Sequence, residues 1–394
     1  MLFGNIALVT CKTDFGTKMP GTKKSATDLG AIIDGIVSWV EIESPTSDVA
    51  AVNRMTDRVA ADVRDLPIEV ERIPGSPQCA DMLLLRTRRD GSGVLILSHI
   101  DTVHPIGTLQ SSPCRREGDK LYGPGIYDMK GGAYLALDAF RRVVQAGSAR
   151  LPITFLFTSD EEIGSPYSRQ RIESEARRAR FVLVTEPARD GGKVVTSRKG
   201  VGRFEAVATG VPAHSGSRHR DGRSAIDEMA RQVLAIAAMT DYGRGVTTNV
   251  GKISGGTAPN VVAERCSITI DLRVPDESTG KEMEAKILRL RSTNPDIKLK
   301  VVGGMNRPPF SKSPAGERLF RHARKMAAEI GFELAEAATT GGGSDGNFTA
   351  ALGVPTLDGL GIDGDGAHTG WEHALISSIV PRTLLMQRLL ETLE

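Results

Sequence analysis

The sequence predicts an α/β protein with two domains, the second inserted into the first. Outside residues 198–307, short apolar runs alternate with stretches of helical periodicity, a pattern typical of a mixed, mostly parallel sheet covered by helices. Within residues 198–307 the order of elements is β-α-β-β-α-β, which is that of a ferredoxin-like α+β domain. The 394 residues are enough for two domains, each with its own core.

The first domain is expected to comprise residues 28–197 and 308–394. Its first two helices are separated by a Ser-Pro-Thr break at residues 44–46. The run at residues 93–98 is apolar throughout, which is typical of a strand buried on both faces. The predicted strands are residues 68–73, 82–87, 93–98, 153–157, 181–184 and 354–357. The predicted helices are residues 29–40, 48–63, 133–146 and 316–330, with a further helix between residues 165 and 181 and a last helix at the carboxyl end.

The inserted domain, residues 198–307, shows the alternating pattern of strands that are half buried. Its predicted strands are residues 201–209, 247–253, 261–274 and 297–302, and its predicted helices are residues 224–239 and 277–291. Residues 1–27 fit neither domain and lack the layout of a secretory signal, so we expect a loosely ordered extension.

Composition excludes several classes of partner. The net charge is only +2, from 50 basic and 48 acidic residues, which argues against nucleic acid or an anionic membrane as the partner. No apolar stretch approaches the roughly 18 residues that a membrane-spanning helix needs. The four cysteines have no C-x-x-C spacing, which disfavours thiolate metal sites and disulfides. We therefore expect a cytoplasmic protein.

Three acidic residues stand together where a predicted buried strand ends. They are Asp160, Glu161 and Glu162, in the sequence TSDEEIGS. Adjacent side chains on an extended chain point in opposite directions, so neighbouring carboxylates can do different work. Taken alone, this stretch could equally be a solvated acidic turn.

Other polar residues occupy equivalent positions along the predicted sheet. His99 and Glu186 each follow a buried strand, and Asp128 lies in the Gly-rich stretch LYGPGIYDMKGG. Ligands of α/β sheets gather beyond the carboxyl ends of the strands. The recurrence of such residues at several ends favours a functional site over a solvated turn.

The residue types fit a metal site without thiolates. His99, and His368 in GIDGDGAHTGWEH, lie in loops and are the better candidates among seven histidines. Nitrogen and oxygen ligands suit catalytic Zn²⁺, and carboxylates can bridge two metals about 3.5–4 Å apart. Asp101 could accept the second ring N–H of His99. Glu161, held beside the metals by Glu162, would take a proton from water.

The ordered motifs resemble the zinc-dependent aminoacylase/carboxypeptidase family. The segments are HIDTV, YGPGIYDMKGG, TSDEEIGS, TEP, VPAHSG, GGSDGNF and GAHT, and the resemblance covers nearly everything after the first thirty residues. It is closest to the bacterial glutamate carboxypeptidases that cleave folates. The family's fold agrees with the fold class predicted above, with the first domain catalytic and the inserted domain serving as lid and dimerisation domain.

The resemblance also implies roles for individual residues. His99 and Glu186 would hold one zinc, Glu162 and His368 the other, and Asp128 would bridge them through a segment with a cis peptide to Met129. Two Zn²⁺ per subunit are implied, with Co²⁺ or Mn²⁺ as substitutes. Glu161 would be the general base and acid, Asp101 would orient His99, and His214 would reach the substrate carbonyl from the partner subunit of a homodimer. The implied substrate contacts are Asn260 and Arg273, which would bind the terminal carboxylate, together with Arg307 and the backbone near Gly343.

Some of these assignments have competitors. His373, five residues after His368, is a rival ligand, although the Gly-rich run before His368 favours the latter. Arg273 could be a surface arginine on a strand, and Arg307 could form a salt bridge at a domain hinge. Tyr127 and Met129 flank Asp128 where the family often has small or acidic residues.

The expected function is hydrolysis of the amide bond N-terminal to a free C-terminal amino acid, with glutamate as the candidate residue. The substrate would be a small peptide or an N-acyl amino acid. A deacylase or dipeptidase on the same scaffold is the alternative within enzymes, because all three share the metal ligands. A non-catalytic metal-binding protein would have no need of Glu161. A nucleotide-binding protein using GGGSDGN lacks the Lys-Ser/Thr of a phosphate-binding loop.

Overall fold

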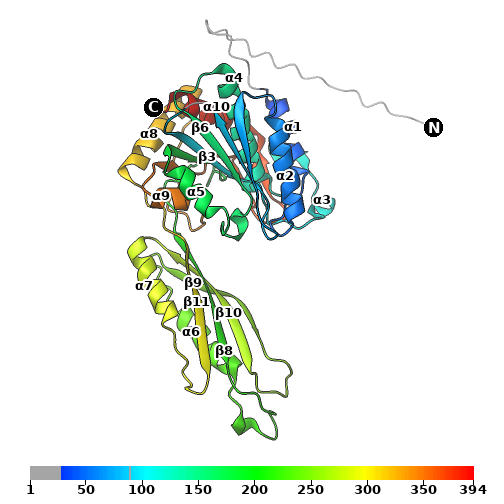
Figure 1. Ribbon diagram of the computed structural model, residues 1–394, viewed down its shortest axis with the longest axis vertical. Coiled ribbons are helices and arrows are strands. Elements are labelled where there is room, and N and C mark those ends of the chain that lie inside the picture. The colour runs from blue at the N-terminus through cyan, green and yellow to red at the C-terminus, as the bar shows by residue number, and fades with distance from the viewer. Residues whose placement is uncertain (1–27, 88–89) are drawn as a thin grey trace, which may run out of the picture.

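The computed structural model describes residues 28–87 and 90–394 and consists of two lobes (Figure 1). The larger lobe contains the chain on both sides of the smaller one, and the predicted fold class is confirmed. The predicted extension at residues 1–27 lies outside the described residues. In the part of the chain that is described, no helix is both long and apolar enough to cross a membrane.

The larger lobe is built on a six-stranded mixed sheet in the order β1-β2-β6-β3-β7-β12. The central strands β6, β3, β7 and β12 are parallel to one another, and β2 and β1 extend the sheet with antiparallel pairing. The strands are β1 (Ile68–Ile73), β2 (Met82–Thr87), β3 (Gly93–His99), β6 (Ile153–Thr158), β7 (Ala179–Val184) and β12 (Thr356–Leu357).

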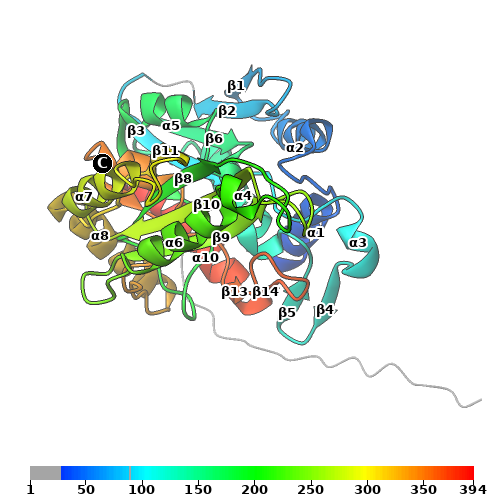
Figure 2. The same cartoon turned by 90° about the horizontal axis from the view of Figure 1, so that it is seen from below.

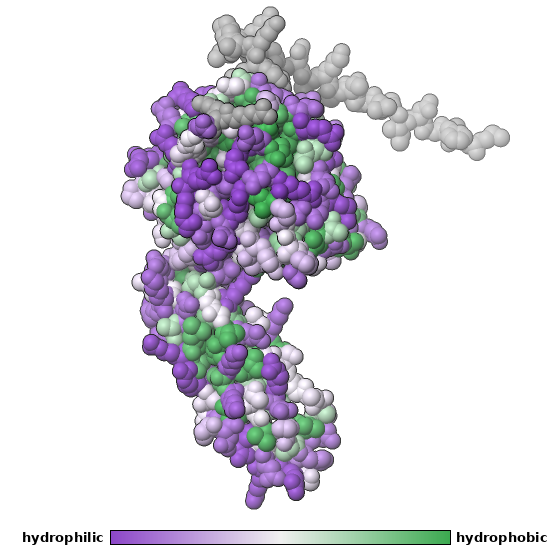
Figure 3. All heavy atoms as spheres, in the orientation of Figure 1, coloured by the Kyte–Doolittle hydropathy of each residue, from purple (hydrophilic) through white to green (hydrophobic). Residues whose placement is uncertain are grey.

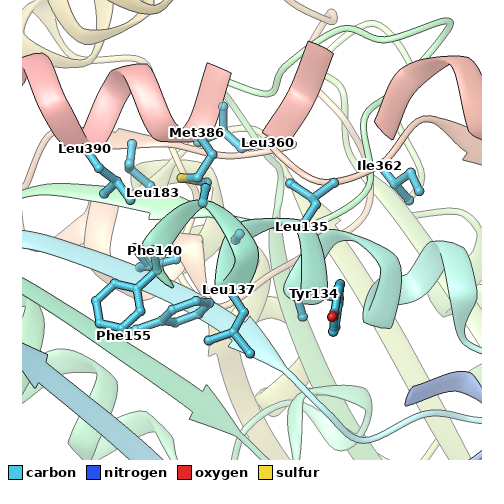
Figure 4. Close-up of a cluster of buried hydrophobic side chains, with 14 of the residues drawn as sticks. Tyr134, Leu135, Leu137, Phe140, Phe155, Leu183, Leu360, Ile362, Met386 and Leu390 are labelled. Carbon is cyan, nitrogen blue, oxygen red and sulfur yellow. The ribbon is translucent and has the colours of Figure 1, made fainter. Parts of the chain in front are cut away.

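Helices cover both faces of this sheet. On one face, side chains of α4 and α10 interdigitate above β6 and β7, as Figure 4 shows for Phe140, Met386 and Phe155. Phe348 and Ile172 close a smaller core on the other face. This two-sided burial explains why β3 is apolar along its whole length. The helices are α1 (Leu29–Val40), α2 (Val49–Asp62), α4 (Gly131–Ala146), α5 (Arg169–Ala176), α8 (Pro314–Ile330), α9 (Gly346–Ala351) and α10 (Ile376–Thr392).

The smaller lobe is an antiparallel sheet in the order β11-β8-β10-β9, with two helices packed on one face. In Figure 2 this lobe lies in front of the larger one. Its own core includes Phe204, Ile270 and Met283. The elements are β8 (Gly200–Thr209), α6 (Ala225–Ala237), β9 (Thr247–Gly255), β10 (Arg265–Val274), α7 (Glu277–Leu288) and β11 (Lys298–Arg307).

The chain crosses between the lobes twice, and the two crossing segments are paired. Arg198 and Phe310 exchange both backbone hydrogen bonds, with N···O distances of 2.9 and 3.0 Å. The Arg198 side chain is fully buried and donates through Nε to Asp358 at 2.7 Å. The junction is therefore a narrow, hydrogen-bonded neck.

A third, four-stranded sheet was not predicted from the sequence. It joins a hairpin after α3 (Thr108–Ser111) to the segment that precedes α10. Its strands have two or three residues each, too few for a periodic pattern. They are β4 (Arg115–Glu117), β5 (Lys120–Tyr122), β13 (Gly364–Asp365) and β14 (His373–Leu375).

Candidate metal centre

The ends of three neighbouring parallel strands bring acidic residues and one histidine together. His99 is the last residue of β3, and its register partner on β6 is Thr158, so the two strands end level. Glu161 and Glu162 follow β6 in a single helical turn, and Glu186 follows β7 by two residues. Two further residues, Asp128 and His368, reach the same place from loops.

Asp128 lies between two groups of candidate ligands. Its Oδ1 is 3.3 Å from Nε2 of His99, and its Oδ2 is 3.4 Å from Nε2 of His368. Nε2 of His99 is 3.8 Å from Glu186, and Nε2 of His368 is 3.3 Å from Glu162. Among the described residues, the ligand atoms of His99, Asp128 and Glu186 lie within 4.8 Å of one another, and so do those of Asp128, Glu162 and His368.

This donor set fits two divalent cations that share one carboxylate. All five residues offer nitrogen or oxygen, as catalytic Zn²⁺ prefers, and each oxygen of Asp128 faces a different group. Oε1 of Glu162 is buried and has no hydrogen-bond partner within the described chain. A buried carboxylate oxygen without a partner is costly, and a cation would satisfy it.

The electrostatics of the cluster also favour cations. Burial raises the pKa of Glu161 to about 8 and shifts that of Glu186 in the same direction. Hydrogen bonds with Asp128 and Glu162 raise the pKa of His368 to about 10. Burial opposes the charged form of Asp128, but His368 and His99 hold the pKa of this carboxyl below its usual range. Carboxylates outnumber the protein's own cations here, and two metal ions would restore the balance.

Asp101 supports the cluster in a way that the sequence did not predict. Its two carboxylate oxygens accept the backbone N–H groups of Glu161 and Glu162, each at 3.2 Å. Nδ1 of His99 is 3.0 Å from the backbone oxygen of Asp101 and 3.5 Å from its carboxylate. The closer acceptor for the His99 ring is therefore the backbone carbonyl, while the predicted carboxylate fixes the Glu161–Glu162 turn.

The loop that carries Asp128 contains the predicted cis peptide bond to Met129, which is confirmed. A residue that sequence reasoning missed, Glu372, accepts the backbone N–H of Asp128 at 2.9 Å. In the sequence Glu372 is one acid in a loop that also contains Asp363 and Asp365, and no spacing distinguishes it.

The rival ligand His373 belongs to neither group. It lies in β14, where its ring packs against Tyr122 with centroids 5.3 Å apart, and its Nδ1 is 3.2 Å from the backbone oxygen of Trp371. His368 instead has a left-handed backbone, with φ of 65°, and lines the pocket next to the cluster. The geometry therefore favours His368 over His373 as the ligand.

A pocket of about 210 Å³ opens beside the cluster and contains several of the expected substrate contacts. Arg307 is buried, and its guanidinium binds Glu161 at 2.7 Å and Asp345 at 2.9 Å. The structure thus places Arg307 in the salt bridge at the hinge that was considered as its alternative. A Cβ on Gly343 would come within 2.7 Å of Arg307, so this position has no room for a side chain. Arg273 also lines the pocket.

His214 and Asn260 lie at the far end of the smaller lobe. Both residues are exposed. They are also neighbours in space, since the backbone N–H of Ser215 donates to the carbonyl of Asn260 at 2.9 Å. The strand β8, whose ten residues span about 33 Å, separates this end from the neck. Within one chain, Asn260 and Arg273 therefore do not come together, although both were expected to bind the same carboxylate.

Comparison with known proteins gives consistent matches. Residues 95–392 match the family described as Peptidase family M20/M25/M40. Carboxypeptidase G2 of Pseudomonas sp. (strain RS-16) is 30% identical over 364 residues, which cover 90% of this chain and 87% of that protein. A succinyl-diaminopimelate desuccinylase of Burkholderia multivorans (strain ATCC 17616 / 249) is 30% identical over 327 residues, or 77% and 84% of the two chains. The solved M20 family metallo-carboxypeptidase Sso-CP2 from Sulfolobus solfataricus shares the fold, with a TM-score of 0.71 at 15% identity over 91% of this chain and 98% of that one.

The shared position of Asp128 makes a specific prediction about metal content. We expect Asp128→Ala to bind less than one Zn²⁺ per chain after dialysis, because both groups lose a ligand. His368→Ala should keep about one, since the group around His99 stays intact. Elemental analysis of the purified variants measures this. The control is His322→Ala, whose ring bonds Thr392 away from the cluster and whose loss should leave two metals. Equal metal content in the Asp128 and His368 variants would contradict a bridging role.

Proposed function

The chain belongs to peptidase family M20/M25/M40, as its motifs predicted, and is a hydrolase of this metallopeptidase family; from this premise we propose that it is a dizinc carboxypeptidase. It would cleave the amide bond N-terminal to a free C-terminal amino acid, with glutamate as the candidate residue. The observation that carries the proposal is the position of Asp128 between two ligand groups, with Glu161 beside them. Co²⁺ or Mn²⁺ could replace Zn²⁺ in the same donor set.

The residues divide the chemistry between them. His99 and Glu186 would hold one metal, Glu162 and His368 the other, and Asp128 both. When bound, the metals would polarise the scissile carbonyl and lower the pKa of a water molecule. Glu161 would accept a proton from this water and later donate it to the nitrogen of the leaving amine, so that the amide gains one water and the carboxylate is regenerated. Arg307 fixes the direction of the Glu161 carboxylate.

The role of Glu161 is tested by a substitution that keeps its size and removes its ability to exchange protons. Glu161→Gln should lower kcat by about 10²- to 10⁴-fold and leave two metals bound, because an amide cannot act as the base. Hydrolysis of dipeptides and N-acyl amino acids, with chelator controls, gives the rates, and elemental analysis gives the metals. Glu173→Gln, on α5, is the matched control on an ion-paired surface glutamate. A metal-loaded Glu161→Gln enzyme with normal rates would remove Glu161 from the mechanism.

The cations of the pocket support an acidic substrate. Arg273 is already paired with Asp271 at 2.8 Å, and Arg307 with two carboxylates. Arg203 lines the same pocket and donates to the carbonyl of Ile163, but within the described residues it forms no ion pair with a carboxylate. Partial burial and the charges of Arg307 and Arg273 lower its pKa. Arg203 is thus available to bind a carboxylate of the substrate, in addition to the α-carboxylate assigned to Arg273.

A deacylase remains the second candidate, because a relative of equal identity is a desuccinylase. A succinyl group also carries a free carboxylate, so the pocket cations suit either substrate. A panel that pairs each acidic dipeptide with the corresponding N-succinyl amino compound separates the two by their kcat/KM.

We expect Arg203→Gln to discriminate between substrates that differ by one charge. Its kcat/KM for a peptide ending in glutamate should fall roughly 10- to 100-fold, and that for the same peptide ending in glutamine should change little, because a charge-assisted hydrogen bond is lost only in the first. Arg273→Ala should weaken both substrates through KM. Arg321→Gln, on the exposed face of α8 and outside the pocket, is the control. Equal losses on both peptides in Arg203→Gln would refute the acidic specificity.

The separation of His214 from the metal cluster supports the expected homodimer. His214 and Asn260 would have to come from a second copy of the chain to meet the substrate. The strand β9 forms an edge of the smaller sheet. Two apolar side chains of this lobe are largely exposed: Ile253 on β9 at 60% and Leu234 on α6 at 72%. Figure 3 shows apolar residues gathered on the visible face of this lobe. An exposed apolar edge strand is a ready surface for symmetric pairing.

Subunit complementation tests this arrangement. Glu161→Gln and His214→Ala should each be nearly inactive alone. In an equal mixture of the two after subunit exchange, half of the dimers would be mixed, and each would have one site with both residues intact. About a quarter of the wild-type activity should therefore return. Absence of recovery in a mixture shown to exchange subunits, or full activity of a monomer at assay dilution, would contradict it.

A further inference from the structure

Glu372 is a buried carboxylate that the mechanism above does not use. It lies just before β14, and only 2% of its surface is exposed. Oε1 accepts the backbone N–H groups of Tyr127 and Asp128 at 2.8 and 2.9 Å, and Oε2 accepts that of Gly125 at 2.9 Å. Three backbone N–H groups of one loop therefore converge on a single side chain from a distant part of the sequence.

The loop that Glu372 holds cannot satisfy these donors by itself. Gly125 has a left-handed backbone with φ of 72°, and Asp128 has φ of −117° and ψ of 91°, which is not helical. Buried backbone N–H groups without an acceptor are costly, so a loop of this shape needs an external partner. Glu372 is that partner, and it fixes the backbone from which the Asp128 carboxylate projects.

His104 completes the arrangement around Glu372. Its Nε2 is 2.6 Å from Oε2 of Glu372, which is within hydrogen-bonding distance. The backbone carbonyl of Glu372 also accepts the N–H of Gly123 at 3.3 Å. The Glu372 carboxylate is thus held by a side chain as well as by the loop, which restricts its own movement.

The same short segment carries His368. The turn between them is closed by backbone hydrogen bonds from Thr369 to Gly366 at 3.0 Å and from Glu372 to Thr369 at 3.4 Å. His368, at one end of this turn, therefore lies at the metal cluster, and Glu372, at the other end, accepts the N–H groups of the loop that carries Asp128. We propose that Glu372, backed by His104, is a positioning residue that sets Asp128 and His368 relative to each other and thereby determines the affinity of the centre for divalent metal.

This inference rests on the proposed metal site and concerns the residues that hold its ligands in place. Partners that orient metal ligands typically change metal affinity or activity 10- to 100-fold when they are replaced. A carboxylate that served only folding would lower stability without a specific effect on metal binding. The chain offers such a carboxylate for comparison: Glu228 in the smaller lobe is fully buried and accepts the backbone N–H of Thr293 at 2.9 Å.

The experiment compares Glu372→Gln with Glu228→Gln in the full-length protein. The probes are Zn²⁺, titrated against a chromogenic chelator, and Co²⁺, whose visible absorption reports ligand geometry. We expect Glu372→Gln to bind Zn²⁺ roughly 10- to 100-fold more weakly, with an altered Co²⁺ spectrum and a lower kcat at unchanged KM. Glu228→Gln should keep the wild-type isotherm and spectrum even if its Tm falls.

A second variant keeps the test informative if Glu372→Gln does not fold. His104→Leu leaves the three backbone hydrogen bonds to Glu372 in place and should weaken Zn²⁺ binding less, in the same direction. Wild-type Zn²⁺ affinity and Co²⁺ spectra in both variants, or equal losses in Glu228→Gln, would overturn the inference. A wild-type protein that binds no metal would instead refute the proposed metal site itself.

Discussion

The structure is organised around negative charge that is buried at the carboxyl ends of three adjacent strands. Glu161, Glu162 and Glu186 lie there together with Asp128, in a place where water is largely excluded. Like charges at such distances raise the free energy of the folded chain unless cations or hydrogen bonds offset them. The most economical explanation for so unfavourable an arrangement is that its counter-charge comes from outside the chain.

The protein stabilises this arrangement mainly through its backbone. Asp101 and Glu372 are both carboxylates, yet each acts by accepting N–H groups from the turns that carry the ligands. Among the described residues, Arg307 contributes the one buried guanidinium that touches Glu161, and it does so from the last residue of β11, at the neck. The Arg307 side chain therefore links the position of the smaller lobe to the direction of the Glu161 carboxylate.

Much of this could be predicted from the sequence, because the information was local. The apolar runs locate the strands, and the polar residues that follow them locate the site. The small sheet of β4, β5, β13 and β14 could not be predicted, since strands of two or three residues leave no periodic signal. Glu372 was missed for a different reason, because its role depends on a loop about 245 positions away. The strand expected from Val261 begins at Arg265, because the turn before it pairs with the segment at His214.

The assignment of Arg307 shows a different limit. The family resemblance implied that Arg307 contacts the substrate, and Arg307 does line the pocket, but its partners, Glu161 and Asp345, come from other segments. Likewise, Asn260 and Arg273 are close in sequence and yet lie at opposite ends of β10. Proximity along a strand does not imply proximity in space, and only the fold separates the two cases.

The paired crossings at Arg198 and Phe310 have a consequence for how such enzymes diversify. The arginines of the smaller lobe that line the pocket, Arg203, Arg273 and Arg307, are all encoded in the one uninterrupted stretch between these crossings. The residues of the metal cluster are encoded outside it. Recombination at two points of a gene could therefore exchange this whole stretch, with His214 and Arg307, and leave the residues of the metal cluster unchanged. The paired segments of the neck therefore mark the two positions between which the inserted domain can be replaced as a unit.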